Sequence, residues 1–185
     1  MDTLAFTVSA NMFGLLGVPP MLGRDFAPPD EDPAAAPVAI LNHRFWEARF
    51  GKRADVIGST VYVDGVGATI IGVMPEGFDF PTKENLWMPV VPANALLQRG
   101  LTPAGFMVVA RLRDGATPQD ARVELEAINR RLEADFPTTN RGIVPTVATH
   151  SETMSGRDAT LTWGSLYVGA WLVLLIACAN LANLV

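Results

Sequence analysis

The stretch TVYVDGVGATIIGV, residues 60–73, is the clearest structural signal in the sequence. Two β-branched runs, Thr60–Val63 and Thr69–Val73, flank a connection that contains Gly65 and Gly67. Glycine reaches positive φ angles without a steric cost, and tight hairpin turns need such angles. The stretch therefore predicts a β-hairpin with Gly65 and Gly67 in its connection.

Strand and helix patterns alternate irregularly on both sides of this hairpin. We expect strands at Leu4–Val8, Val38–Leu41, Met107–Leu112 and Val144–Thr149. We expect helices at Met12–Leu16, between the N-cap Asn42 and Gly51, and at Pro118–Asp135. No regular βαβ period connects these elements, so the pattern favours an α+β fold, with mixed sheet hairpins and packed helices.

The helix at Pro118–Asp135 has the best-defined start. Thr117 is suited to the N-cap, Pro118 to the first helical position, and Asp120 to a capping box. Four apolar residues at helical spacing predict its core-facing side: Ala121, Leu125, Ile128 and Leu132.

An aromatic-rich segment follows the hairpin among several prolines. Phe78, Phe80 and Trp87 lie in this segment, which we interpret as a loop held against the core. The same aromatic side chains could instead form a surface for a partner or ligand, and the sequence leaves both interpretations open.

The last 27 residues differ from the rest, because every charged residue lies at or before Asp158. Leu161–Val185 is uncharged, and as a helix it would be about 37 Å long, against a hydrocarbon core of about 30 Å. Its apolar residues run around the whole circumference, which favours a transmembrane helix over a buried core helix. We therefore predict one C-terminal transmembrane helix.

Candidate functional residues of this segment are predicted from its spacing. Three aromatic residues, four positions apart, suit the membrane interface: Trp163, Tyr167 and Trp171. Small or polar residues suit packing against other transmembrane helices: Ser165, Gly169, Asn180 and Asn183.

Composition excludes several classes of function. A net charge of −5, from 14 Lys and Arg against 19 Asp and Glu, disfavours nucleic acid as a partner. The single cysteine, Cys178, allows neither an intrachain disulfide nor a cysteine-based zinc site.

The sequence also lacks the usual signs of catalysis. Gly51-Lys52-Arg53 is the nearest approach to a P-loop, and it lacks the upstream glycine and the hydroxyl that a phosphate site needs. The two histidines, His43 and His150, have no second ligand at a suitable spacing, and no base is placed for Ser9 or Ser151. The acidic run from Asp30 to Asp32 is better interpreted as a solvated loop than as a cation site. We predict no catalytic, cofactor or metal residues.

A series of short motifs resembles one known family, the MacB-like periplasmic core domain. The matching stretches are VSANMF (8–13), LGVPP (16–20), LGRDF (22–26), PVAILNHRFW (37–46), FG (50–51), IG (57–58), VDG (63–65), IGVMP (71–75) and GF (77–78). The tail LLIACANLANL, residues 174–184, resembles the start of an FtsX-like permease region. The order of the motifs is most similar to that in the large duplicated permeases of acidobacterial type.

The resemblance implies a piece of an ABC-transporter-type permease of the bacterial inner membrane. Residues 1–158 would be the periplasmic core domain, and residues 159–185 the truncated second transmembrane helix, with the first helix upstream. The domain would act in mechanotransmission or in contact with a partner or substrate, without catalysis.

The implied partners are the lipid bilayer, the other transmembrane helices, a cytoplasmic ATPase that binds any ATP used, and a periplasmic or lipid-linked substrate. The alternative from another class is a membrane-anchored hydrolase with its active site in the Pro-rich loops.

Overall fold

The computed structural model describes residues 5–91, 107–155, 167 and 169–174, and it divides into two compact units. The first unit is Met1–Arg111 and the second is Leu112–Val185. The predicted boundary between residues 158 and 159 lies outside the described residues, so the division into a periplasmic domain and a membrane segment stays a prediction.

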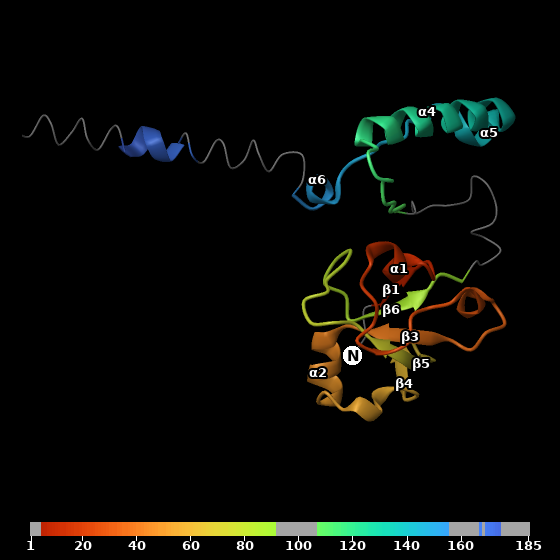
Figure 1. Ribbon diagram of the computed structural model, residues 1–185, viewed down its shortest axis with the longest axis vertical. Helices are drawn as coiled ribbons and strands as arrows, with labels where there is room; N and C mark the ends of the chain where they lie inside the picture. The colour runs from red at the N-terminus through yellow and green to blue at the C-terminus, as the bar shows by residue number, and fades with distance from the viewer. Residues whose placement is uncertain (1–4, 92–106, 156–166, 168, 175–185) are drawn as a thin grey trace, which may run out of the picture. The chain divides into compact units, whose positions relative to one another are not determined.

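The first unit is a mixed α+β domain, labelled in Figure 1. Its strands are β1 (Ala5–Val8), β2 (Leu22–Gly23), β3 (Val38–Leu41), β4 (Thr60–Val63), β5 (Val66–Val73) and β6 (Leu86–Pro89). Its helices are α1 (Met12–Leu16), α2 (His43–Phe50) and two 3₁₀ turns, η1 (Pro28–Glu31) and η2 (Ala54–Val56). The predicted α+β class and the elements around residues 5–8, 12–16, 38–51 and 60–73 are therefore confirmed.

All six strands form one sheet with the order β1-β6-β3-β5-β2, and β4 pairs with β5. β1 and β6 are parallel, as are β3 and β5, whereas β6 runs antiparallel to β3. β3 lies in the middle of this order, and all four of its residues are buried. Strand β6 falls in the segment that we interpreted as an aromatic-rich loop, so that interpretation was wrong for Leu86–Pro89.

The predicted hairpin is formed by β4 and β5, but its turn differs from the expectation. Val63 pairs with Val66, which leaves a two-residue turn of Asp64 (φ 48°) and Gly65 (φ 81°). Gly67 lies within β5, opposite Tyr62, so the second positive φ angle belongs to Asp64. Aspartate tolerates the left-handed region better than most residues, which makes this turn possible.

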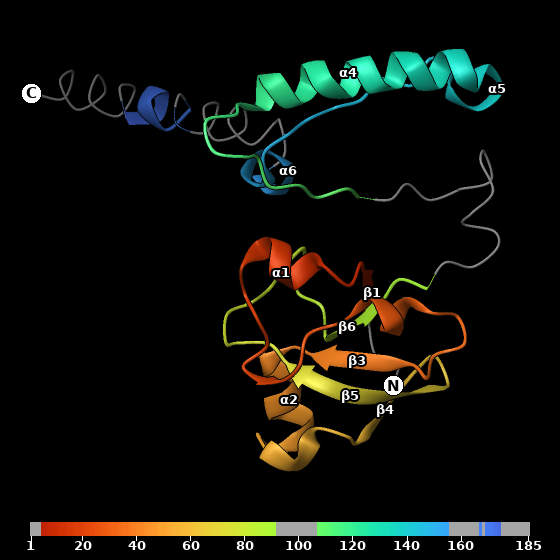
Figure 2. The same cartoon turned by 45° about the vertical axis from the view of Figure 1, so that its right-hand side comes forward.

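The sheet separates two hydrophobic clusters, because successive side chains of a strand point to opposite faces. On one face Leu41 and Trp46 belong to a cluster that α2 helps to build. On the other face Ile40 and Phe13 belong to a cluster that α1 helps to build. Figure 2 shows α1 and α2 on opposite sides of the strands. Both faces are covered, which explains why β3 has no polar alternation.

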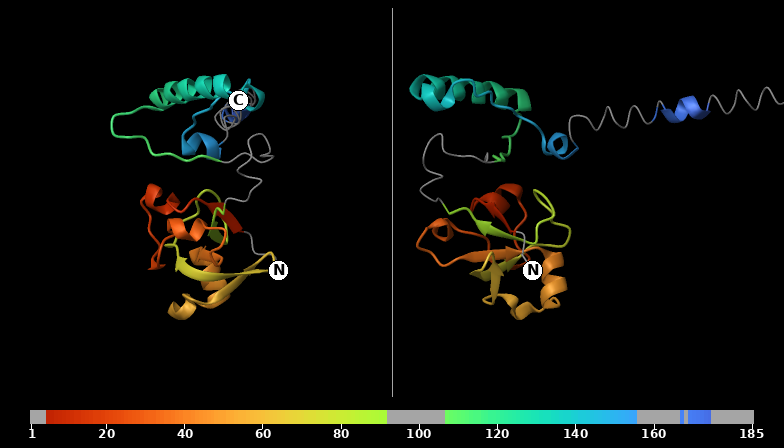
Figure 3. Two further views of the ribbon diagram at one scale, coloured as in Figure 1. Left: turned by 90° about the vertical axis from the view of Figure 1, so that its right-hand side faces the viewer. Right: turned by 180° about the vertical axis from the view of Figure 1, so that it is seen from behind.

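The second unit contains α4 (Pro118–Asp135), α5 (Pro137–Asn140) and α6 (His150–Ser155). α4 starts as predicted, because the Thr117 and Asp120 side chains form a reciprocal capping box. The short α5 contacts α4, and both are teal in Figure 3. None of the helices among the described residues is long and apolar enough to cross a membrane.

Two predicted strands and one predicted core face of this region are wrong. Residues 107–112 and 144–149 are irregular rather than extended in a sheet. No residue of α4 is buried, and the exposed fractions of Leu125 and Ile128 are 40% and 46%. Ala121 and Leu132 of the same face are partly buried, so the described residues cover this face only in part.

Candidate functional site

Asn42 connects three segments that are far apart in the sequence. Its side-chain oxygen accepts from the backbone N–H of Arg44 (2.9 Å), which caps α2, while its amide donates to the Phe78 carbonyl (2.9 Å). The amide also lies 3.3 Å from a carboxylate oxygen of Asp79, which pairs with Arg44 at 2.9 Å. Its backbone N–H donates to the carbonyl of Asn85. A residue predicted only as an N-cap therefore also fixes the loop between β5 and β6.

The aromatic residues of that loop and of β6 form packing contacts. The indole of Trp87 is fully buried, and its Nε1–H donates to the Phe80 carbonyl (3.0 Å). Its ring meets Phe78 and Phe13 edge to face, with centroid distances of 5.4 and 5.7 Å. A fully buried ring cannot contact a partner, so the interpretation of Trp87 as part of a binding surface is wrong.

Arg24 and Asp30 brace the loop before β3. Two hydrogen bonds of 2.7 and 2.9 Å join the guanidinium to the two carboxylate oxygens, and Asp30 also accepts from the Ala27 N–H (2.8 Å). These hydrogen bonds lower the pKa of Asp30, and those from Arg24 have the largest effect. The neighbouring Asp25 is different, because burial raises its pKa more than a hydrogen bond from the Phe26 N–H lowers it.

The other two acids of this loop are also used by the fold. A carboxylate oxygen of Glu31 accepts from the N–H of Ala10 (2.6 Å), and one of Asp32 accepts from the N–H of Ala34 (2.8 Å). The acidic run is therefore a set of internal acceptors, rather than a merely solvated loop. Among the described residues, no group of three His, Cys, Asp or Glu could hold a metal ion.

The described contacts of His43, Ser9 and Ser151 are local ones. His43 is 7% exposed in the first turn of α2, with its ring 5.4 Å from that of Trp46. The Ser9 hydroxyl donates to the side-chain oxygen of Asn11 (2.7 Å), which is an amide and no general base. The Ser151 hydroxyl lies 3.1 Å from that of Thr149.

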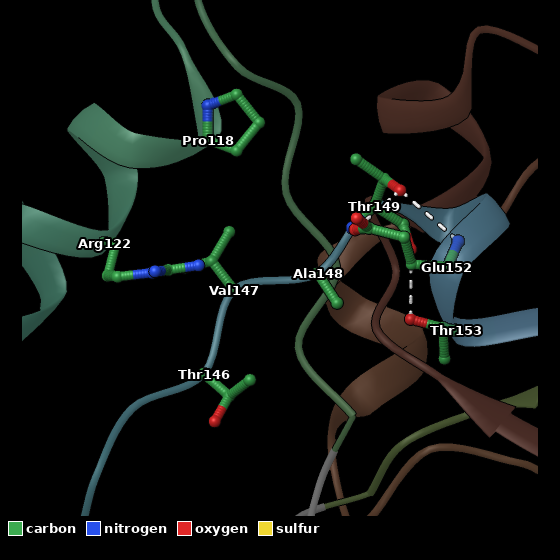
Figure 4. A pocket seen from close by; sticks show the side chains of 8 residues that line it. All are labelled: Pro118, Arg122, Thr146, Val147, Ala148, Thr149, Glu152 and Thr153. Carbon is green, nitrogen blue, oxygen red and sulfur yellow. Dashed lines mark hydrogen bonds between the residues drawn. The ribbon is translucent and has the colours of Figure 1, made fainter. Parts of the chain in front are cut away.

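A hollow of about 470 Å³ lies in the second unit, between the start of α4 and the segment before α6. Figure 4 shows its lining: Pro118, Arg122, Thr146, Val147, Ala148, Thr149, Glu152 and Thr153. The Glu152 carboxylate accepts from the N–H and the hydroxyl of Thr149, at 2.7 and 2.9 Å. Arg122 forms no ion pair with any described residue.

The chemistry of this hollow is that of a polar recess. Arg122 offers a cation and donors, and Thr146 offers a hydroxyl, while Val147 and Ala148 add apolar wall. The one hydroxyl–carboxylate pair among its described lining residues, Thr149 with Glu152, belongs to a reciprocal set of hydrogen bonds that also includes both backbone N–H groups, as in a helix cap. Sequence analysis missed the hollow because half of its lining comes from an irregular segment that was predicted as a strand.

The predicted membrane residues are only partly described. Tyr167, Gly169 and Trp171 are helical, and the two aromatic side chains are 69% and 63% exposed. The remaining four candidates lie outside the described residues: Trp163, Ser165, Asn180 and Asn183. The assignment of all seven to a membrane interface or to helix packing stays a prediction.

Comparison with known proteins gives one family. The model of the MacB-like periplasmic core domain matches residues 2–128. A relative in Pseudomonas syringae pv. syringae (strain B728a), named "Probable syringafactin export ATP-binding/permease protein SyfD", is 28% identical over 171 residues. That alignment covers 88% of this chain but 25% of SyfD, so the chain spans about a quarter of its relative. Neither match supports the hydrolase alternative.

Two solved structures are similar to the chain. The periplasmic region of MacB from Actinobacillus actinomycetemcomitans has 15% identity and a TM-score of 0.46, with 74% of this chain and 58% of that chain covered. The extracellular domain of the ABC-type transporter YknZ from Gram-positive bacteria has 15% identity and a TM-score of 0.38, with 90% and 66% covered.

Proposed function

Because the chain belongs to the MacB-like periplasmic core domain family, and residues 2–128 are therefore a periplasmic segment of an inner-membrane protein, we propose that it serves an ABC-transporter-type permease. In this role the domain passes motion between the membrane and the periplasm, or contacts a partner or substrate, and catalyses nothing. The match of the family model over residues 2–128 is the observation that carries this proposal.

The bracing of the first unit supports a mechanical role. The Asn42 side chain holds the β5–β6 loop to α2, and the Arg24–Asp30 pair holds the loop before β3. The Arg24 N–H donates to the Ile71 carbonyl of β5 at 2.9 Å, which attaches the second loop to the sheet, so the unit can move as one body. A body of this kind transmits displacement better than a flexible loop would.

We further propose that residues 159–185 are the start of an FtsX-like permease region and enter the bilayer. The uncharged run from Leu161 supports this, as do Tyr167 and Trp171, whose exposed rings are one helical turn apart. In this arrangement Asn180 and Asn183 meet other transmembrane helices of the same permease.

Nucleotide, in this proposal, is bound outside these 185 residues by an ATPase partner or region. The sequence has no P-loop, and SyfD carries both activities in its printed name. Export is the direction of transport that the name of this relative suggests. In this proposal a periplasmic ligand contacts the polar hollow beside Arg122.

Protease accessibility tests the proposal. Spheroplasts of cells that produce the full-length protein expose only the outer face of the inner membrane. A protease added to them should cleave within residues 1–158. A cytoplasmic marker protein must remain intact as the control. If residues 1–158 stay protected until the membrane is opened, the assignment fails.

A further inference from the structure

The first and last strands of the six-stranded sheet lie side by side. β1 and β6 run parallel, with Ala5 opposite Leu86 and Val8 opposite Pro89. The N–H of Val90 donates to the Val8 carbonyl at 2.8 Å, which extends the ladder past the end of β6. In Figure 2 the red β1 and the green β6 are neighbours. The first and the last strand of the sheet are therefore hydrogen-bonded to each other.

This pairing determines how the sheet responds to a pulling force. The chain enters the sheet at the start of β1 and leaves it at the end of β6, and parallel strands start at the same end. A pull between these points therefore slides one strand lengthwise along the other. The hydrogen bonds between the strands run across this direction, so all of them resist at once. An antiparallel hairpin pulled apart at its open end instead loses its hydrogen bonds one after another.

Packing reinforces the same pair of strands. Val8 is 3% exposed in the cluster beside α1, so sliding β1 also withdraws an apolar side chain from the core. β6 is held from its other side by β3, where Trp87 pairs with Ile40 and Leu86 with Leu41. β1 is therefore hydrogen-bonded to a strand that β3 holds in place from its other side.

We propose that the β1–β6 pair is a mechanical clamp, loaded in shear, which lets the first unit carry tension without unfolding. The inference rests on the proposed role in transmitting motion, which supplies the tension. The geometry of the clamp itself follows from the β1–β6 pairing and does not depend on that role.

Force spectroscopy of the 185-residue chain in mild detergent tests the clamp. One molecule is pulled between its N-terminus and a cysteine at Val91→Cys, with Cys178→Ser removing the native thiol. A second, which also carries Cys178→Ser, is pulled between Thr60→Cys and Thr69→Cys, a facing pair near the open end of the β4–β5 hairpin, one residue inside the hydrogen bonds to Ile70. At equal loading rate, the rupture force should be at least about twofold higher in the first geometry. Equal forces would overturn the proposal.

Two proline variants check the hydrogen bonds, each compared with the alanine variant at the same position, because Phe6 is partly buried and Thr7 is exposed. The Val8 carbonyl faces β6, so by alternation the N–H of Phe6 faces β6 too, while that of Thr7 faces away. Phe6→Pro should lower the rupture force in the first geometry and leave the hairpin geometry unchanged, whereas Thr7→Pro should change neither. An equal loss in both variants would also refute the clamp. The assay involves no cells, so its failure is distinct from a failure of the protease test.

Discussion

Replacing Asn42 with alanine should destabilise the first unit more than the small change in side-chain volume suggests. The change removes the cap of α2, which is worth about 1 kcal/mol. It also leaves the partly buried Phe78 carbonyl without its donor, which costs about 1–2 kcal/mol more. At 2% exposure the site admits little water to replace these bonds. We expect a loss of about 2–3 kcal/mol in the free energy of unfolding, or a urea midpoint lower by roughly 1–2 M.

The measurement is urea unfolding of residues 1–155, followed by the fluorescence of Trp46 and Trp87. Asn11→Ala is the matched control, because Asn11 is also an N-cap residue but its side chain makes no cap hydrogen bond. This control should cost less than about 0.5 kcal/mol. If Asn42→Ala and Asn11→Ala shift the midpoint equally, the role assigned to Asn42 is wrong.

Three further predictions use the same unfolding assay. Gly23→Ala should lower the free energy of unfolding by about 2–4 kcal/mol, because φ at Gly23 is +75° and the new Cβ would overlap the Ile71 carbonyl oxygen. Gly58→Ala is the control, because φ is +87° but the space around it is open, and it should cost only about 1 kcal/mol. Equal losses in the two variants would contradict this prediction. Gly65→Val should cost roughly 1 kcal/mol or more through strain at φ +81°, and an unchanged midpoint would refute the turn. The pKa of Asp30 is lowered in the fold, so its stabilisation is present above the unfolded value of 3.8 and is lost as the pH falls through the folded pKa. Asp30→Asn should therefore be less stable at pH 7 and converge with the wild type in acid, and a gap that does not shrink would refute this pH dependence.

Local signals predicted the elements whose form depends on nearby residues. The caps at Asn42 and Thr117 and the hairpin at residues 60–73 all follow from chemistry within a few positions, and all are present. The strands predicted at 107–112 and 144–149 failed, because a β-branched run becomes a strand only when a partner strand pairs with it. β6 was missed for the opposite reason, since two distant strands, β1 and β3, make a strand of a Pro-flanked segment.

The contacts at the candidate sites also divide into those that depend on nearby residues and those that depend on distant ones. The capping role of Asn42 could be predicted, but its bond to Phe78 spans 36 residues and has no local signal. The internal use of Asp30 and Glu31 likewise depends on partners at Arg24 and Ala10, which the fold supplies. Function itself came from the ordered motif series, because no residue type in this chain specifies a reaction.

The β4–β5 hairpin has a consequence for handling the protein. β4 pairs only with β5 among the described strands, so one side of Thr60–Val63 presents unpaired N–H and carbonyl groups to solvent. From residue 59 to residue 73 the one charged side chain is Asp64, and Tyr62 lies 69% exposed on the outer face. Natural edge strands usually carry a lysine, a proline or a bulge that discourages pairing with another molecule. In a concentrated solution of residues 1–155, which lack the apolar run from Leu161, we expect this strand to promote aggregation, and Tyr62→Lys is the simplest protection for crystallisation or spectroscopy.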